Sequence, residues 1–219
     1  MPALPCFFHS SSIMKHFRKP SSVVKSWEIE SNCNTSLEQG RYTWRHNSVL
    51  SSIIHGIRAN LIDGFMLYSD LEGFHAPHGG VIPPDILVTN LKPDLFLVND
   101  TDRIIVLLEL TCPWDSNIER SHIYKEEKYA PLIADLSRNF KVFQFSIEVS
   151  VRGQITKGNR ARIKSFAYRC CRDPRAVSSA LLKSCSKLSL LCSYSIFCAR
   201  KEPSWSSPRL LAIRWSLHF

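Results

Sequence analysis

"PDLFLVNDTDRIIVLLELT", residues 93–111, decides much of the fold that we expect for this chain. It contains two apolar runs rich in β-branched and aromatic residues, which favour strands, and "NDTD" between them consists of turn formers. We therefore expect a β-hairpin with its turn at residues 99–102. Pro113 ends the second strand, because proline cannot donate a hydrogen bond to a β-ladder.

The segments on either side of this hairpin alternate between helical and extended patterns. Asp115 or Ser116 is the expected N-cap of the helix that follows the hairpin. "MLYSD", residues 66–70, is interpreted as core and loop. The pattern predicts an α/β (α+β) fold, with a small mixed β-sheet flanked by helices and an extra C-terminal helix. The expected helices are 37–57, 117–139, 157–173 and about 175–200, and the other extended runs are 83–90 and 141–150.

The composition allows a packed core and offers no membrane span. Hydrophobic residues make up 44% of the 219 residues, and no apolar run reaches the roughly 18 residues that a transmembrane helix needs. The eight cysteines include no CxxC pair, so a self-contained zinc ribbon is not expected. Without a recognisable secretory signal, we expect these cysteines to be reduced thiols.

Charge is segregated along the chain. Residues 1–60, 61–140 and 141–219 carry formal charges of +4, −7 and +12. An acidic centre between basic flanks favours a centre that binds cations and flanks that bind phosphates. The alternative is a set of solvated faces of opposite charge, with no ligand involved.

Two carboxylates come together in the predicted hairpin. With a turn at 99–102, residue i pairs with about residue 201 − i, so Glu109 becomes the diagonal same-face neighbour of Asp94. Two carboxylates so close repel each other unless a cation lies between them. Oxygen ligands in an acidic setting suit Mg²⁺ or Mn²⁺, with waters and a substrate phosphate completing the shell.

The next helix carries cations on one face. Lys125 and Lys128 are three residues apart, so both can point toward the strand end and stabilise a charged phosphate. The alternative is a solvated helix in which Glu126 and Glu127 balance the two lysines. Spacing alone does not decide between these interpretations.

These residues resemble a known nuclease core. Pro93-Asp94 and Glu109-Leu110-Thr111 resemble the PD-(D/E)xK motif, with E-x-T in place of E-x-K. More narrowly, "GRYTWRHNSVL … LKPDLFLV … VLLELTCPWDSNIE … KEEKYAPLI … IEVSVRG" is similar to the C-terminal restriction-like endonuclease of reverse transcriptases from metazoan non-LTR retrotransposons. The resemblance covers about residues 31–205, including "SYSIFCARKEPSW".

The resemblance implies a site, a cofactor and partners. Asp94 and Glu109 match the metal-binding acids, and Lys125 and Lys128 match a K-x-x-K-Y pattern whose lysine replaces the one missing from E-x-T. It implies Mg²⁺ or Mn²⁺, duplex DNA as substrate, element RNA as a partner of upstream domains, a nuclear location, and neither a membrane nor a small-molecule substrate. The residues expected on DNA are Arg41, Arg45, His46, Arg152, Lys157, Arg160, Arg162 and Lys164.

The implied activity is nicking of target DNA so that the 3′ end primes reverse transcription. We expect residues 1–32 to be a poorly ordered lead-in left by a truncated upstream region, residues 33–173 to be the endonuclease domain, and residues 174–219 to be the C-terminal helix and tail. The chain is thus expected to be a fragment of a reverse transcriptase. The alternative is a catalytically inactive retroelement-derived remnant that only binds DNA or a protein partner.

Several features depart from the family pattern or stay open. Family members carry a cysteine/histidine zinc knuckle upstream of "GRYTWRHN", where this chain keeps only Cys33, and the spacing of Cys6, His9 and His16 argues against zinc. The paired catalytic aspartates of a polymerase are absent. Glu148 is expected to pair with Arg152, with a role as an extra metal ligand as the alternative.

Overall fold

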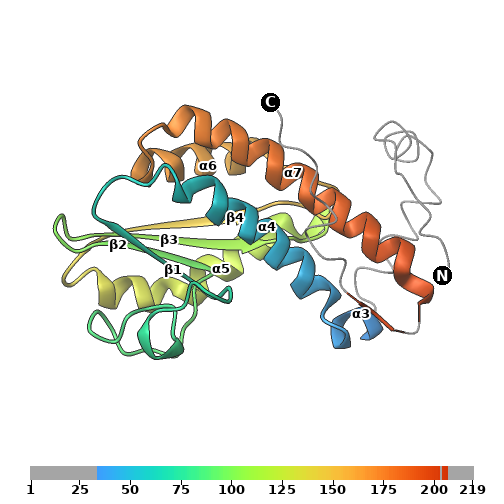
Figure 1. Cartoon of the computed structure of the whole chain (residues 1–219), viewed down its shortest axis with the longest axis horizontal. Helices are drawn as coiled ribbons and strands as arrows, with labels where there is room; N and C mark the ends of the chain where they lie inside the picture. The colour runs from blue at the N-terminus through green and yellow to red at the C-terminus, as the bar shows by residue number, and fades with distance from the viewer. Residues whose placement is uncertain (1–33, 203, 207–219) are drawn as a thin grey trace, which may run out of the picture.

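A computed structural model describes residues 34–202 and 204–206 and shows a four-stranded mixed sheet (Figure 1). The strands lie in the order β1-β2-β3-β4. The first three are antiparallel, and β4 is parallel to β3 because helix α5 forms the crossover between them. The strands are β1 (Phe65–Ser69), β2 (Leu95–Asn99), β3 (Ile104–Thr111) and β4 (Lys141–Glu148). The expected mixed α/β class is confirmed.

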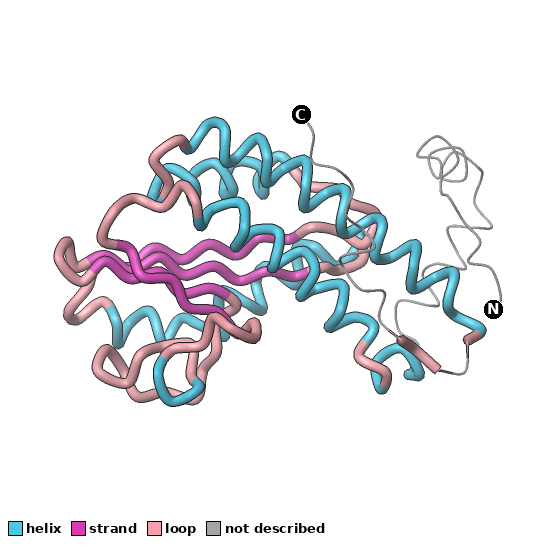
Figure 2. Tube along the Cα trace, viewed as in Figure 1, coloured by secondary structure: helices cyan, strands magenta, loops and turns pink. Residues whose placement is uncertain are grey.

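Helices cover both faces of the sheet (Figures 1 and 2). α5 lies on one face, and α4, α6 and α7 lie on the other, with α4 and α7 side by side. The α-helices are α3 (Asn34–Glu38), α4 (Arg41–Arg58), α5 (Ile118–Leu136), α6 (Lys157–Cys170) and α7 (Pro174–Cys198). Short 3₁₀ turns are η1 (Pro77–Gly79), η2 (Asp115–Asn117) and η3 (Ala199–Lys201).

The sheet separates two apolar clusters. Alternate side chains of a strand point to opposite faces, so Leu95 and Leu97 pack toward α4 and α7 while Phe96 and Val98 pack toward α5. Every residue of β2 is buried, as expected for a strand covered on both faces. Helix α7 belongs to the same core as the sheet, since its residue Leu181 is buried in the cluster with α4 and α6. The two expected segments 33–173 and 174–219 therefore share one core over their described parts.

Helix ends follow local chemistry. Thr156 caps α6 by accepting from the Asn159 amide, and Asp173 caps α7 by accepting from the Ala176 amide. Pro174 opens α7 at a position where its missing N–H costs nothing. The expected cap at Asp115 or Ser116 is wrong, because these residues form η2 and α5 begins after it.

Three further expectations are corrected. Residues 83–90 are not a strand, because the amides of Ile86 and Leu87 turn back onto the Pro83 carbonyl. "MLYSD" lies mostly in β1, a five-residue edge strand whose Met66 is exposed and therefore gives a weak apolar signal. The hairpin pairs Leu95 with Leu108, so paired residue numbers total 203 rather than 201.

Residues 1–32, expected to be a lead-in, lie outside the described residues. Among the residues that are described, none of the helices has the length and apolar character needed to cross a membrane.

Candidate active site

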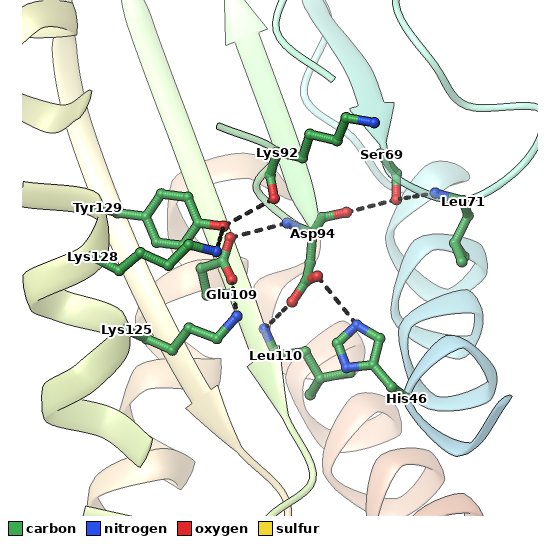
Figure 3. A network of polar contacts seen from close by, with 10 residues as sticks. All are labelled: His46, Ser69, Leu71, Lys92, Asp94, Glu109, Leu110, Lys125, Lys128 and Tyr129. Carbon is green, nitrogen blue, oxygen red and sulfur yellow. Dashed lines mark hydrogen bonds and ion pairs between the residues drawn. The ribbon is translucent and has the colours of Figure 1, made fainter. Parts of the chain in front are cut away.

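Asp94 and Glu109 meet at one end of the hairpin (Figure 3). Continuing the observed register by one step places them directly opposite each other, not diagonally as expected. The Asp94 amide donates to Glu109 Oε1 at 3.1 Å, and the Leu110 amide donates to Asp94 Oδ2 at 2.7 Å. Each carboxylate is thus held by the backbone of the opposing segment. The register differs from expectation because Asn99 still belongs to β2 and its Oδ1 accepts from the Asp102 amide, which moves the turn to residues 100–103.

Lys125 is the lysine that reaches the carboxylates. Its Nζ donates to Glu109 Oε2 at 2.6 Å, and the two side chains are 16% and 2% exposed. Lys128 lies one turn further along α5, and its Nζ contacts the Tyr129 hydroxyl at 3.1 Å. Tyr129 in turn donates to the Lys92 carbonyl, which ties α5 to the segment that precedes Asp94. Of the two candidate lysines, the geometry brings Lys125 into the acidic pair.

His46 is part of this cluster, a position that sequence reasoning missed. It was expected on DNA, but its Nε2 lies 3.2 Å from Asp94 Oδ1 (Figure 3). An ionised carboxylate can only accept, so Nε2 carries the proton and donates. His46 reaches the site from α4, on the sheet face opposite α5. Nothing in the spacing of "RHN" to "PD" could have revealed this contact, because it joins residues 48 positions apart.

The two carboxylates differ in proton affinity. Burial raises the pKa of Asp94, but His46, Lys125 and the Leu110 amide outweigh burial and leave that pKa below its ordinary value. Burial and the charge of Asp94 raise the pKa of Glu109, and Lys125 offsets this only in part. Burial lowers the pKa of Lys125, but the nearby Glu109 and Asp94 raise it above its ordinary value. Lys125 is therefore a fixed cation at neutral pH.

The donor chemistry fits a hard divalent cation. Each of the four carboxylate oxygens accepts one protein donor, and an ionised carboxylate has about four lone-pair sites, so half of them remain for other ligands. No group of three or more His, Cys, Asp or Glu side chains suited to a metal occurs within residues 34–202. Proteins usually bind Mg²⁺ through one or two carboxylates, and waters and substrate phosphate complete the coordination shell. A four-ligand zinc site fits less well, and Cys6, His9, His16 and Cys33 lie outside the described residues.

Arg41 and Arg45 are not free to bind DNA, which corrects the expectation for both. Arg41 is 1% exposed, and its guanidinium donates to the Ala199 and Glu202 carbonyls. Arg45 is also buried and donates to the Cys112 carbonyl at 3.1 Å. A buried guanidinium needs such acceptors, since leaving it unpaired costs several kcal/mol. Both arginines therefore stabilise the fold.

The expected pairing of Glu148 with Arg152 is wrong. Arg152 forms an ion pair with Asp115 and lies over the Trp114 ring. Glu148 instead contacts His122 Nδ1 at 3.2 Å and Arg162 Nη1 at 3.7 Å. The reason is that residues 149–156 lead directly into α6, whose first turns lie beside the end of β4.

The remaining basic residues expected on DNA lie on α6. Lys157, Arg160 and Lys164 are exposed there, and Arg160 Nε donates to the Ile155 carbonyl within its own segment. Lys157 and Arg160 lie in the first turn of α6, next to Asn159, whose side chain contacts the end of β4, and Lys164 lies farther along the helix. This surface is electrostatically suited to phosphates.

No protein-family model matches the sequence, and no curated protein matches it. The fold and the site alone define the class, a mixed α/β protein with two carboxylates and a lysine at the end of a β-hairpin.

Proposed function

We propose that this chain is a metal-dependent DNA endonuclease of the restriction-like, PD-(D/E)xK type. The observation that carries the proposal is the ion pair between Lys125 and Glu109, beside Asp94. E-x-K nucleases take their lysine from the strand, two residues after the acid, and Thr111 occupies that position here. In this chain a lysine from the following helix reaches the acid instead. A charged group placed in this way has a chemical use, because phosphodiester hydrolysis concentrates negative charge on the phosphate.

The chain's own residues would position and neutralise the reacting groups. When bound between Asp94 and Glu109, Mg²⁺ would offset charge on the phosphate and favour an ionised water. His46 and the Leu110 amide hold the Asp94 carboxylate by hydrogen bonds to its two oxygens. Lys125 would leave Glu109 Oε2, its partner in this structure, and stabilise the phosphate as its charge develops.

The proposed biological setting rests on the motif resemblance. The domain would nick target DNA as part of a retrotransposon reverse transcriptase, and the freed 3′ end would prime reverse transcription. DNA is then the partner of this chain, with element RNA bound through other parts of the protein, and the reaction takes place in the nucleus. The basic surface of α6 supports the DNA partner through its charge.

Plasmid nicking tests the proposal. Purified protein should convert supercoiled plasmid to the open circle with Mg²⁺ or Mn²⁺ and should not do so in EDTA. Asp94→Asn should abolish the reaction, and Asp85→Asn, which changes an exposed aspartate in the loop before the hairpin, should not. If the protein binds DNA but no divalent metal supports nicking, the chain is an inactive DNA-binding remnant. If Asp94→Asn nicks at the wild-type rate, Asp94 and Glu109 do not form the active site.

A further inference from the structure

A second polar cluster lies beside the proposed active site. Glu148 at the end of β4 is 1% exposed, and it contacts His122 of α5 and Arg162 of α6. Arg162 Nη2 lies 2.8 Å from His122 Nε2, and Arg162 Nη1 donates to Asn159 Oδ1 at 3.1 Å. Asn159 is fully buried and its Oδ1 also accepts from the Glu148 amide. Three elements therefore converge on one guanidinium.

The hydrogen bonds of this cluster define its protonation. A guanidinium has no acceptor, so His122 Nε2 must accept from Arg162 and cannot carry a proton. The proton is then on His122 Nδ1, which donates to Glu148 Oε1 at 3.2 Å. The chain of contacts runs from a cation through a neutral imidazole to a buried anion. The other carboxylate oxygen, Glu148 Oε2, has no hydrogen-bond partner among the described residues and lies 3.7 Å from Arg162 Nη1.

The cluster is adjacent to the acidic pair on the same face of the sheet. Glu109 pairs with Ser146 in the β3–β4 register, and Glu148 is two residues further along β4, so the side chains of both glutamates point toward α5. On α5, His122 precedes Lys125 by three residues, which places it on the same helix face and about 4.5 Å along the axis. Arg162 Nη2 lies 2.8 Å from His122 Nε2, so the guanidinium lies beside the turn of α5 that precedes Lys125. A second cation beside Lys125 is suited to the phosphate next to the one that Lys125 contacts, because successive phosphates of a strand each carry a negative charge.

Arg162 can still bind a ligand in this position. Its side chain is 35% exposed, whereas those of His122 and Glu148 are 15% and 1% exposed. A guanidinium has five N–H donors, and the bonds to Asn159 and His122 use two of them. Arginine held on one edge can present its other edge to a phosphate in a bidentate manner. The buried partners restrict the motion of a long side chain that otherwise loses entropy on binding.

We infer that Arg162 binds the DNA phosphate next to the scissile one, and that Glu148 and His122 are positioning residues that aim its guanidinium there. The inference rests on the proposed nuclease function. It distinguishes Arg162 from the exposed cations of α6, which attract DNA without a fixed geometry. It also explains why the Glu148 carboxylate is buried beneath a surface that is expected to contact DNA, because the negative charge of Glu148 holds Arg162 in place.

The test uses phosphate neutralisation. Nicks made by the wild-type protein in a short duplex are mapped, and each phosphate flanking the strongest nick is replaced in turn by an uncharged methylphosphonate. One neighbouring replacement should slow wild-type nicking about tenfold, the low end for a hydrogen bond to a charged group. In Arg162→Ala, nicking of the unmodified duplex should be about tenfold slower, and the same replacement should have almost no further effect.

The positioning residues are tested by the same comparison, the nicking rate on the unmodified duplex divided by the rate on the methylphosphonate duplex. Glu148→Gln and His122→Gln should each lose most of the sensitivity at that phosphate, although neither residue touches DNA, while melting temperatures show that both variants fold. Arg138→Ala, which changes an exposed arginine in the turn just after the far end of α5, should keep the full sensitivity. Unchanged sensitivity in Arg162→Ala overturns the inference and leaves the nuclease standing. Loss in Arg162→Ala but not in the other two overturns the positioning role. A wild type that never nicks overturns the proposed function and this inference together.

Discussion

Replacing Lys125 by methionine should separate the structural role of this residue from its proposed catalytic role. The change removes the cation beside Glu109 and keeps most of the side-chain volume. Lys125 Nζ lies 2.6 Å from Glu109 Oε2, and that glutamate is 2% exposed. Removing one partner of a buried ion pair costs about 3–5 kcal/mol of unfolding free energy. Because Lys125 keeps 16% exposure, we expect the low end, about 3 kcal/mol, without divalent cations.

The loss of unfolding free energy in Lys125→Met should depend on pH. The pKa of Glu109 is already raised by burial and by Asp94, and losing Lys125 raises it further, so protonation favours the folded variant. The ordinary pKa of a glutamate side chain is 4.5. Protonating a glutamate with that pKa costs about 4.8 kcal/mol of free energy at about pH 8 and about 2.0 kcal/mol at about pH 6. The carboxylate therefore stays charged and destabilising at the higher pH. At the lower pH, protonation limits the loss to about 2 kcal/mol.

Urea denaturation in EDTA at the two pH values measures this difference. Lys128→Met is the matched control, and we expect it to change the unfolding free energy by less than about 0.5 kcal/mol, because Lys128 is exposed. With Mg²⁺ and plasmid, Lys125→Met should slow nicking by about 100-fold or more, as for removal of one electrostatic contact to a transition state. Equal stability of Lys125→Met and wild type at the higher pH would refute the buried ion pair. Equal nicking rates would refute the catalytic role.

Three further outcomes are expected. Mg²⁺ should raise the melting temperature of the wild type but not of Asp94→Asn in a thermal shift assay, and a shift that survives the substitution would place the cation elsewhere. Changing Lys157 and Lys164 to glutamine should reduce the slope of log affinity against log salt by about 1.8 in fluorescence anisotropy; an unchanged slope contradicts the α6 surface. Adding Thr111→Lys to the Lys125→Met variant should not restore its nicking activity, because a lysine on the strand competes with the metal. Full recovery of nicking would count against the role of the lysine on α5.

Local patterns were enough to predict most of the fold. The hairpin at 93–111, the last strand and the helices after it follow from residue periodicity and turn chemistry, which act over a few residues. The pairing of Asp94 with Glu109 followed for the same reason, because one hairpin contains both. Even there the register was two residues in error, since the Asn99 side chain organises the turn in a way that composition does not reveal.

Long-range packing was not predictable from these patterns. Arg41, Arg45 and His46 look alike in sequence, as polar residues in the first turns of one helix. Their environments differ because the C-terminal segment packs on α4: Arg45 meets Ser193, which is 148 positions away, and Arg41 meets carbonyls beyond the end of α7. His46 instead faces Asp94. Only the folded chain distinguishes two buried arginines from a histidine in the site.

The hairpin has a consequence for the order in which the chain folds. Asp94 and Glu109 are 15 residues apart, whereas Lys125 is a further 16 residues away and His46 lies 48 residues before Asp94. Contacts between residues near in sequence form early, since they close the shortest loops. The two carboxylates should thus come together before Lys125 or His46 reaches them, and the repulsion between them would raise the folding barrier. On the proposed metal-dependent function, a divalent ion bound by the forming hairpin would speed folding as well as stabilise the folded site.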